Sequence, residues 1–112
     1  MRIATPLLII LISLSSCTTT RHAGDRVEPK TLVRVENRNF LDMKIYVLRG
    51  AERIRIGTVT GNSTEVLVIP QYLVVGAGLI RFLADPIGGN QAPISQEISV
   101  RPGQEVELII TN

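Results

Sequence analysis

The chain has 112 residues, which is enough for a single domain. Its 12 Lys and Arg residues against 10 Asp and Glu residues give a formal net charge of +2, which argues against a dedicated nucleic-acid binder because such domains carry a strong basic excess. The single Cys excludes a disulfide within the chain, and one Cys with one His excludes a zinc site built from these residue types.

The first sixteen residues have the pattern of a secretory signal peptide. Met1 and Arg2 give a positive start, and an apolar run follows from Ile3 to Leu14. This run is too short for a transmembrane helix, which needs about 20 residues, and it fits the apolar region of a signal peptide. We therefore predict a signal peptide over residues 1–16.

The signal region ends in Leu14-Ser15-Ser16-Cys17. This motif closely resembles the bacterial lipobox, and the resemblance implies cleavage after Ser16, a diacylglycerol on the Cys17 thiol and an acylated new amine. The alternative is an ordinary signal peptide that leaves Cys17 as a free thiol or as half of an intermolecular disulfide. A free thiol is a liability in an oxidising compartment, so acylation also accounts for the residue. Thr18 is not the Asp typical of inner-membrane retention, and the resemblance therefore implies an outer-membrane anchor, with the domain on the periplasmic side in a Gram-negative envelope.

Residues 17–30 are predicted to be a flexible tether between the acylated Cys17 and the domain. Beyond the Cys, only Ala23 and Val27 are apolar, so the segment cannot bury a core. His22, the only histidine, lies here, where a tether does not supply the fixed geometry that a catalytic or metal-binding role needs.

Residues 31–112 are predicted to form one all-β domain. This region has ten Val and ten Ile against four Ala, and β-branched residues favour strands. Apolar and polar residues alternate repeatedly, as in Leu32-Val33-Arg34-Val35-Glu36, which is the period of a half-buried strand. Seven strands are expected, at about 31–37, 42–49, 52–60, 64–70, 77–84, 94–101 and 104–111.

Turn residues separate these strands, with Pro102-Gly103 at the centre of a type II turn as the clearest example. The stretch from Pro70 to Gly78 is open to three interpretations: a buried strand segment, a crossover between sheets, or a single helical turn. A crossover suits a Greek-key arrangement best.

The strand pattern and the closing sequence from Val100 to Leu108 resemble the last hairpin of Ig-like and transthyretin-like sandwiches. The whole chain resembles small bacterial envelope lipoproteins that carry one such domain. The resemblance implies a single seven-stranded antiparallel β-sandwich, Ig-like with Greek-key connections, and it transfers no catalytic or ligand-binding residue.

Residue types for catalysis are scarce in the domain. It contains neither His nor Cys, so Ser-His and Cys-His pairs are impossible. Glu97 and Glu105 could oppose one another across the last hairpin, although such carboxylates are more simply solvated. Asp85 and Asn90 alone are too few ligands for Ca²⁺. We therefore expect no enzyme, no metal and no cofactor.

The most distinctive surface feature is basic. Arg49, Arg53 and Arg55 fall on one predicted hairpin, with Arg53 and Arg55 on the same face and Tyr46 and Leu48 on the outward parity of the preceding strand. If the facing of that strand is inverted, Tyr46 and Leu48 are instead covered by the other sheet. One interpretation is a docking patch for an acidic partner. The other is a solvated sheet face whose charges pair with Glu36 and Glu52 or block edge-to-edge aggregation.

Two functions of different classes remain. The first is a non-enzymatic envelope lipoprotein whose sandwich binds another envelope protein or is structural. The second is a lipoprotein that binds a small ligand or a glycan. Glycans stack on exposed aromatic rings, and the chain offers only Phe40, Tyr46, Tyr72 and Phe82, of which Phe82 is expected in the core. This scarcity favours the first function.

Overall fold

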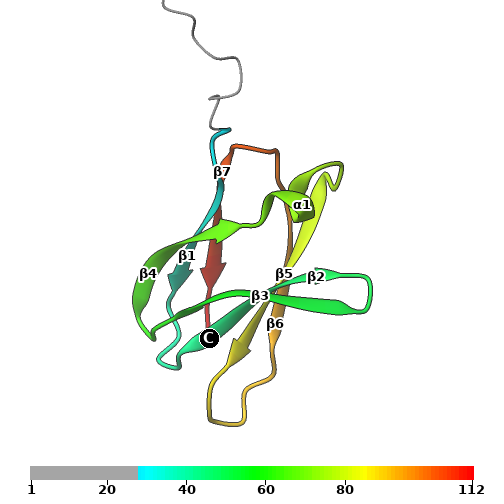
Figure 1. The fold of residues 1–112 in the computed structure, drawn as a ribbon. Helices are drawn as coiled ribbons and strands as arrows, with labels where there is room; N and C mark the ends of the chain where they lie inside the picture. Colours follow the sequence, from blue (N-terminus) through cyan, green and yellow to red (C-terminus); the bar gives the residue numbers. More distant parts are fainter. Residues whose placement is uncertain (1–27) are drawn as a thin grey trace, which may run out of the picture.

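The computed structural model describes residues 28–112, and these form a sandwich of two β-sheets (Figure 1). The predicted signal peptide, Cys17 and all but the last three residues of the predicted tether lie outside the described residues. The elements, in chain order, are β1 (Thr31–Asn37), β2 (Met43–Arg49), β3 (Glu52–Val59), β4 (Ser63–Ile69), α1 (Gln71–Val74), β5 (Leu79–Pro86), β6 (Ile94–Ser99) and β7 (Glu105–Ile110). The prediction of an all-β domain with seven strands in this region is confirmed.

One sheet has the strand order β4-β1-β7, and the other has the order β3-β2-β5-β6. The pairs are antiparallel except for β1 and β7, which run parallel with Leu32 opposite Glu105 and Val35 opposite Leu108. The prediction of a wholly antiparallel sandwich is therefore wrong at this pair. The physical reason is that the first strand lies in the middle of its sheet, and the last strand completes that sheet on the side that β4 leaves free.

The predicted last hairpin is also corrected, because β6 and β7 belong to different sheets. The turn between them still has the expected chemistry. The amide of Gln104 donates to the carbonyl of Arg101 at 3.1 Å, and Gly103 has a φ of 80°, which a type II turn requires at that position. This turn carries the chain from one sheet to the other instead of closing a hairpin.

The segment after β4 combines two of the three interpretations left open by the sequence. Residues 71–74 form a single helical turn, and the segment as a whole crosses from the three-stranded sheet to the four-stranded sheet. Leu73 and Val74 are buried and fix the turn to the core.

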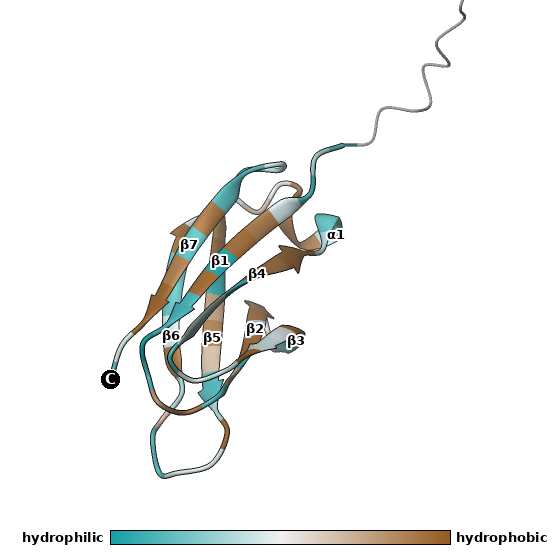
Figure 2. Ribbon diagram, turned by 90° about the vertical axis from the view of Figure 1, so that its left-hand side faces the viewer, coloured by the Kyte–Doolittle hydropathy of each residue, from teal (hydrophilic) through white to brown (hydrophobic). Residues whose placement is uncertain are grey.

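The core lies between the sheets and is built by alternation along the strands, which Figure 2 shows as alternating brown and teal bands on β1 and β7 (Figure 2). Its fully buried members include Val33 and Val35 of β1, Ile45 of β2 and Phe82 of β5. Phe82 is thus in the core, as predicted. Each strand buries one face and leaves the other for solvent or a partner.

Candidate functional site

The hairpin β2–β3 presents two of the three predicted arginines on the outer face of the four-stranded sheet. Arg53 lies opposite Leu48 and Arg55 lies opposite Tyr46 in the antiparallel register. The guanidinium carbon of Arg53 is 5.9 Å from the centre of the Tyr46 ring, within the range of a cation–π contact. The register therefore confirms that Arg53 and Arg55 share a face with the outward residues of β2.

The same face continues onto β5, where Arg81 lies opposite Leu48 and Leu83 lies opposite Tyr46. Leu83 is only 6% exposed, yet it points away from the core because its neighbours Phe82 and Ala84 point into it. The outer face thus has its own thin apolar layer beneath charged side chains. We call Tyr46, Leu48, Arg53, Arg55 and Arg81 the arginine face.

Arg49 does not belong to this face. It ends β2, and its guanidinium carbon lies 6.0 Å from the ring centre of Tyr72 on α1. The sequence grouped Arg49 with Arg53 and Arg55 because all three belong to one hairpin. The position of α1 beside the end of β2 could not be read from local patterns.

The charges of Arg53 and Arg55 are not neutralised by ion pairs within residues 28–112. The ion pairs in this region join Arg38 to Glu36 at 3.1 Å and Arg81 to Glu97. Arg55 donates instead to the hydroxyl of Thr58. Glu36 lies on the other sheet and pairs with Arg38, so it does not pair with the hairpin arginines. Glu52 lies opposite Arg49 in the β2–β3 register.

At the opposite end of the sandwich from α1, two buried asparagines hold the loops together, and no sequence pattern predicted their role. The Asn37 side-chain amide donates to the carbonyls of Leu41 at 2.8 Å, Thr60 at 3.2 Å and Val59 at 3.3 Å. Its Oδ1 accepts from the amide of Asn39 at 3.0 Å.

Asn39 extends this network to a third loop. Its Nδ2 donates to Oε1 of Gln91 at 2.7 Å, and its Oδ1 accepts from the amide of Leu41 at 2.9 Å. Both asparagines are at most 1% exposed. The loops 38–42, 60–62 and 87–93 are thereby joined into one preorganised end, and we call this end the asparagine end.

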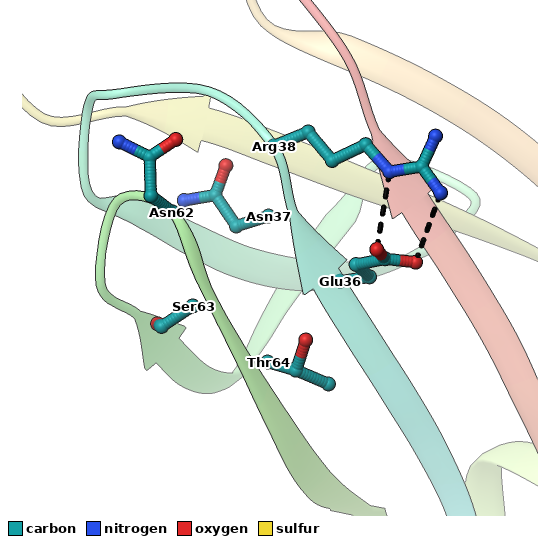
Figure 3. Close-up of a pocket in the computed structure, with 6 residues that line it drawn as sticks. All are labelled: Glu36, Asn37, Arg38, Asn62, Ser63 and Thr64. Atoms are coloured by element: carbon teal, nitrogen blue, oxygen red, sulfur yellow. Dashed lines mark hydrogen bonds and ion pairs between the residues drawn. The ribbon is translucent and has the colours of Figure 1, made fainter.

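A shallow hollow of about 210 Å³ lies beside the asparagine end, as Figure 3 shows (Figure 3). Its lining is polar and consists of Glu36, Asn37, Arg38, Asn62, Ser63 and Thr64. Arg38 and Glu36 pair with each other across one side of it. The hollow offers hydroxyl and amide groups for a small polar ligand. Its two charged residues, Glu36 and Arg38, are already paired with each other.

The carboxylates singled out from the sequence do not form a site. Glu97 pairs with Arg81 on the four-stranded sheet, whereas Glu105 lies on the other sheet, so the two do not oppose one another. Asp85 lies opposite Lys44 in the β2–β5 register. Within residues 28–112, no three His, Cys, Asp or Glu residues are grouped so that they could hold a metal ion.

No helix in the described part of the chain is long and apolar enough to cross a membrane. Cys17 and His22 lie outside that part. Comparisons of the chain with protein-family models, curated proteins and solved structures gave no match.

Proposed function

We propose that this protein is a non-enzymatic envelope lipoprotein, anchored through an acylated Cys17 to the periplasmic side of an outer membrane, and that its β-sandwich is a protein-interaction module. The observation that carries the proposal is the arginine face, on which Arg53 and Arg55 form no ion pair with any residue of 28–112 and lie beside a partly buried apolar layer. We propose an acidic envelope protein as the partner.

The chemistry of this face suits protein recognition better than catalysis. Tyr and Arg are the residue types most enriched at interface hot spots, where an apolar centre is combined with directed polar contacts. Tyr46 supplies a ring against which the Arg53 guanidinium lies, and Leu48 follows on the same face of the same strand. An acidic partner could form charge-assisted hydrogen bonds with both arginines while covering the apolar layer.

The first prediction concerns this face. The double variant Arg53→Glu with Arg55→Glu is expected to lose at least about tenfold in recovery of the partner, because each reversal replaces an attraction with a repulsion at the interface. The measurement is a crosslinking pull-down from intact envelopes with the acylated protein.

The matched control is Arg34→Glu with Arg101→Glu, which makes the same change of charge at two exposed residues away from the arginine face. This control should recover the partner as the unchanged protein does. Equal losses in both double variants would show a nonspecific effect of net charge and would contradict the assigned surface.

The second prediction concerns the anchor. Cys17→Ser removes the thiol that the lipid would occupy, so the protein is expected to move from the membrane fraction to the soluble fraction. Fractionation, together with mass spectrometry of the N-terminal peptide, measures this. An unchanged membrane fraction, or an N-terminal peptide without acyl chains, would contradict the lipoprotein assignment.

A second candidate function is the binding of a small polar ligand or a glycan at the hollow of Figure 3. The observation that favours it is the polar lining together with Phe40, which is 67% exposed in the adjoining loop and could stack on a sugar ring. Recovery of the anchored protein without any protein partner in the pull-down would favour this candidate over the first.

We also propose that the domain is a transthyretin-like rather than an Ig-like sandwich. In immunoglobulin constant-type domains the first two strands share a sheet. In this chain β1 and β2 lie in different sheets, and β1 lies between β4 and β7. The strand order therefore favours the second of the two sandwich types that the sequence resembles.

A further inference from the structure

Residues 28–30 lead into β1 at the end of the sandwich where α1 lies. Gln71 of α1 donates from its Nε2 to Oε2 of Glu28 at 2.9 Å, and the amide of Gly103 donates to the hydroxyl of Thr31 at 2.8 Å. Residues 28–31, α1 and the β6–β7 turn are therefore neighbours, as the upper part of Figure 1 shows (Figure 1). The C-terminus and the asparagine end lie at the far end of the sandwich.

This entry end exposes three large apolar side chains from one short segment. Tyr72 is 61% exposed, Val75 is 64% exposed and Leu79 is 63% exposed. The residues between Tyr72 and Val75 are buried in the core, so the segment is firmly seated while these three side chains project from it. We call Tyr72, Val75 and Leu79 the entry patch.

The charged residues around the entry patch nearly balance. The bases at this end are Lys30, Arg49, Arg53, Arg81 and Arg101, and the acids are Glu28, Glu52, Glu97 and Glu105. Arg49 lies against the ring of Tyr72, so its charged head is held beside an aromatic side chain with a polar tip. Tyr is typical of the membrane–water interface, where long basic side chains also extend towards the head groups.

We infer that the entry patch is the surface on which the domain rests against the bilayer, an inference that rests on the proposed acylation of Cys17. Ten residues separate Cys17 from Glu28, so the chain cannot hold the entry end more than about 40 Å from the lipid anchor. Contact of the patch with lipid is then an intramolecular event at high effective concentration, for which three side chains suffice without a large binding area.

The balanced charge makes this contact mainly apolar, so it is expected to persist in zwitterionic vesicles and at high salt. The other exposed apolar residues face elsewhere. Val66 and Val68 lie on the outer face of the three-stranded sheet, and Phe40 lies at the asparagine end. Resting on the entry patch would leave both of those surfaces, and the part of the arginine face around Tyr46 and Arg55, open to the periplasm. Leu48 and Arg81, which line one hollow with Leu79, would lie near the bilayer.

The test uses the acylated full-length protein in phosphatidylcholine vesicles, with an environment-sensitive fluorophore on a single introduced cysteine. Val75→Cys and Leu79→Cys probe the entry patch. Val66→Cys and Val68→Cys are the matched controls, because these valines are 50% and 47% exposed on a strand of the other sheet. The acylated Cys17 does not compete for the label.

Labels at positions 75 and 79 are expected to emit at shorter wavelength and to lose most of their emission to brominated lipid, at low and at high salt. Labels at 66 and 68 should emit as in water. If the protein floats with the vesicles while all four labels emit as they do in water, the entry patch does not contact the bilayer and the inference is wrong. The proposed acylation of Cys17 would still be supported. If the protein does not float with the vesicles, the proposed lipid anchor itself fails.

Discussion

Asn37→Ala is expected to lower the free energy of unfolding by about 3 kcal/mol. The substitution removes a buried amide that donates to three backbone carbonyls and an oxygen that accepts from the amide of Asn39. These backbone groups would be left without partners in a buried place, and each such group costs on the order of 1–3 kcal/mol. Urea denaturation followed by circular dichroism measures the change.

The control for Asn37 is Asn90→Ala, at an exposed position in the 87–93 loop, for which a change within about 0.5 kcal/mol is expected. A loss below about 1 kcal/mol for Asn37→Ala would mean that water replaces the lost donors. The asparagine end would then not be held together by Asn37.

Gly61→Ala is expected to destabilise the domain by about 3 kcal/mol or more. A Cβ at this position would lie 2.1 Å from the carbonyl oxygen of Phe40, and the obstacle is backbone, which cannot rotate away. The loop 38–42 would have to move, and its contacts with Gly61 and Asn62 would be disturbed. The Asn62 amide donates to the Asn39 carbonyl oxygen, and the Gly61 amide donates to Asp42 Oδ1. For a domain of this size, such a loss is a large part of the total stability.

The comparison for Gly61 is Gly50→Ala in the β2–β3 turn. Gly50 has a φ of 59°, but a Cβ there would meet nothing within 4 Å, so only the backbone preference is lost, at about 1 kcal/mol. Thermal melts of the two variants should therefore separate clearly. Equal melting temperatures would show that the close approach at Gly61 relaxes easily.

The strands could be predicted from the sequence because alternation is a local signal. In β2 the buried residues Met43, Ile45 and Val47 alternate with Tyr46 and Leu48, which the pattern placed outside. The signal weakens at β6, where Ile94 is 38% exposed although its parity is that of the buried Val100. β6 is an edge strand, so its first residue has few neighbours to cover it.

The pairing of strands could not be predicted in the same way. Which strand completes the sheet beside β1 depends on contacts between the two ends of the chain, and no turn residue records it. The asparagine end was missed for a related reason. Asn37 is the last residue of the expected strand 31–37, and Asn39 follows two residues later. Both are buried and hydrogen-bonded to distant loops only because the 60–62 and 87–93 loops approach them.

The candidate site was predicted in part. The alternation of apolar and polar residues along the strands correctly placed Arg53 and Arg55 on one face with Tyr46 and Leu48. It could not separate Arg49, whose neighbour Tyr72 comes from the crossover, and it could not show that Leu83 lies beneath the same face.

The central place of β1 has a kinetic consequence. Among the described strands β1 comes first in the sequence, yet one of its two partners, β7, comes after all the others, so the three-stranded sheet cannot close until β7 has been synthesised. Pairings between distant parts of a chain slow folding. Under the proposed export, which would require this chain to cross a membrane unfolded, the strand order would keep the domain from reaching its native state before β7 is released.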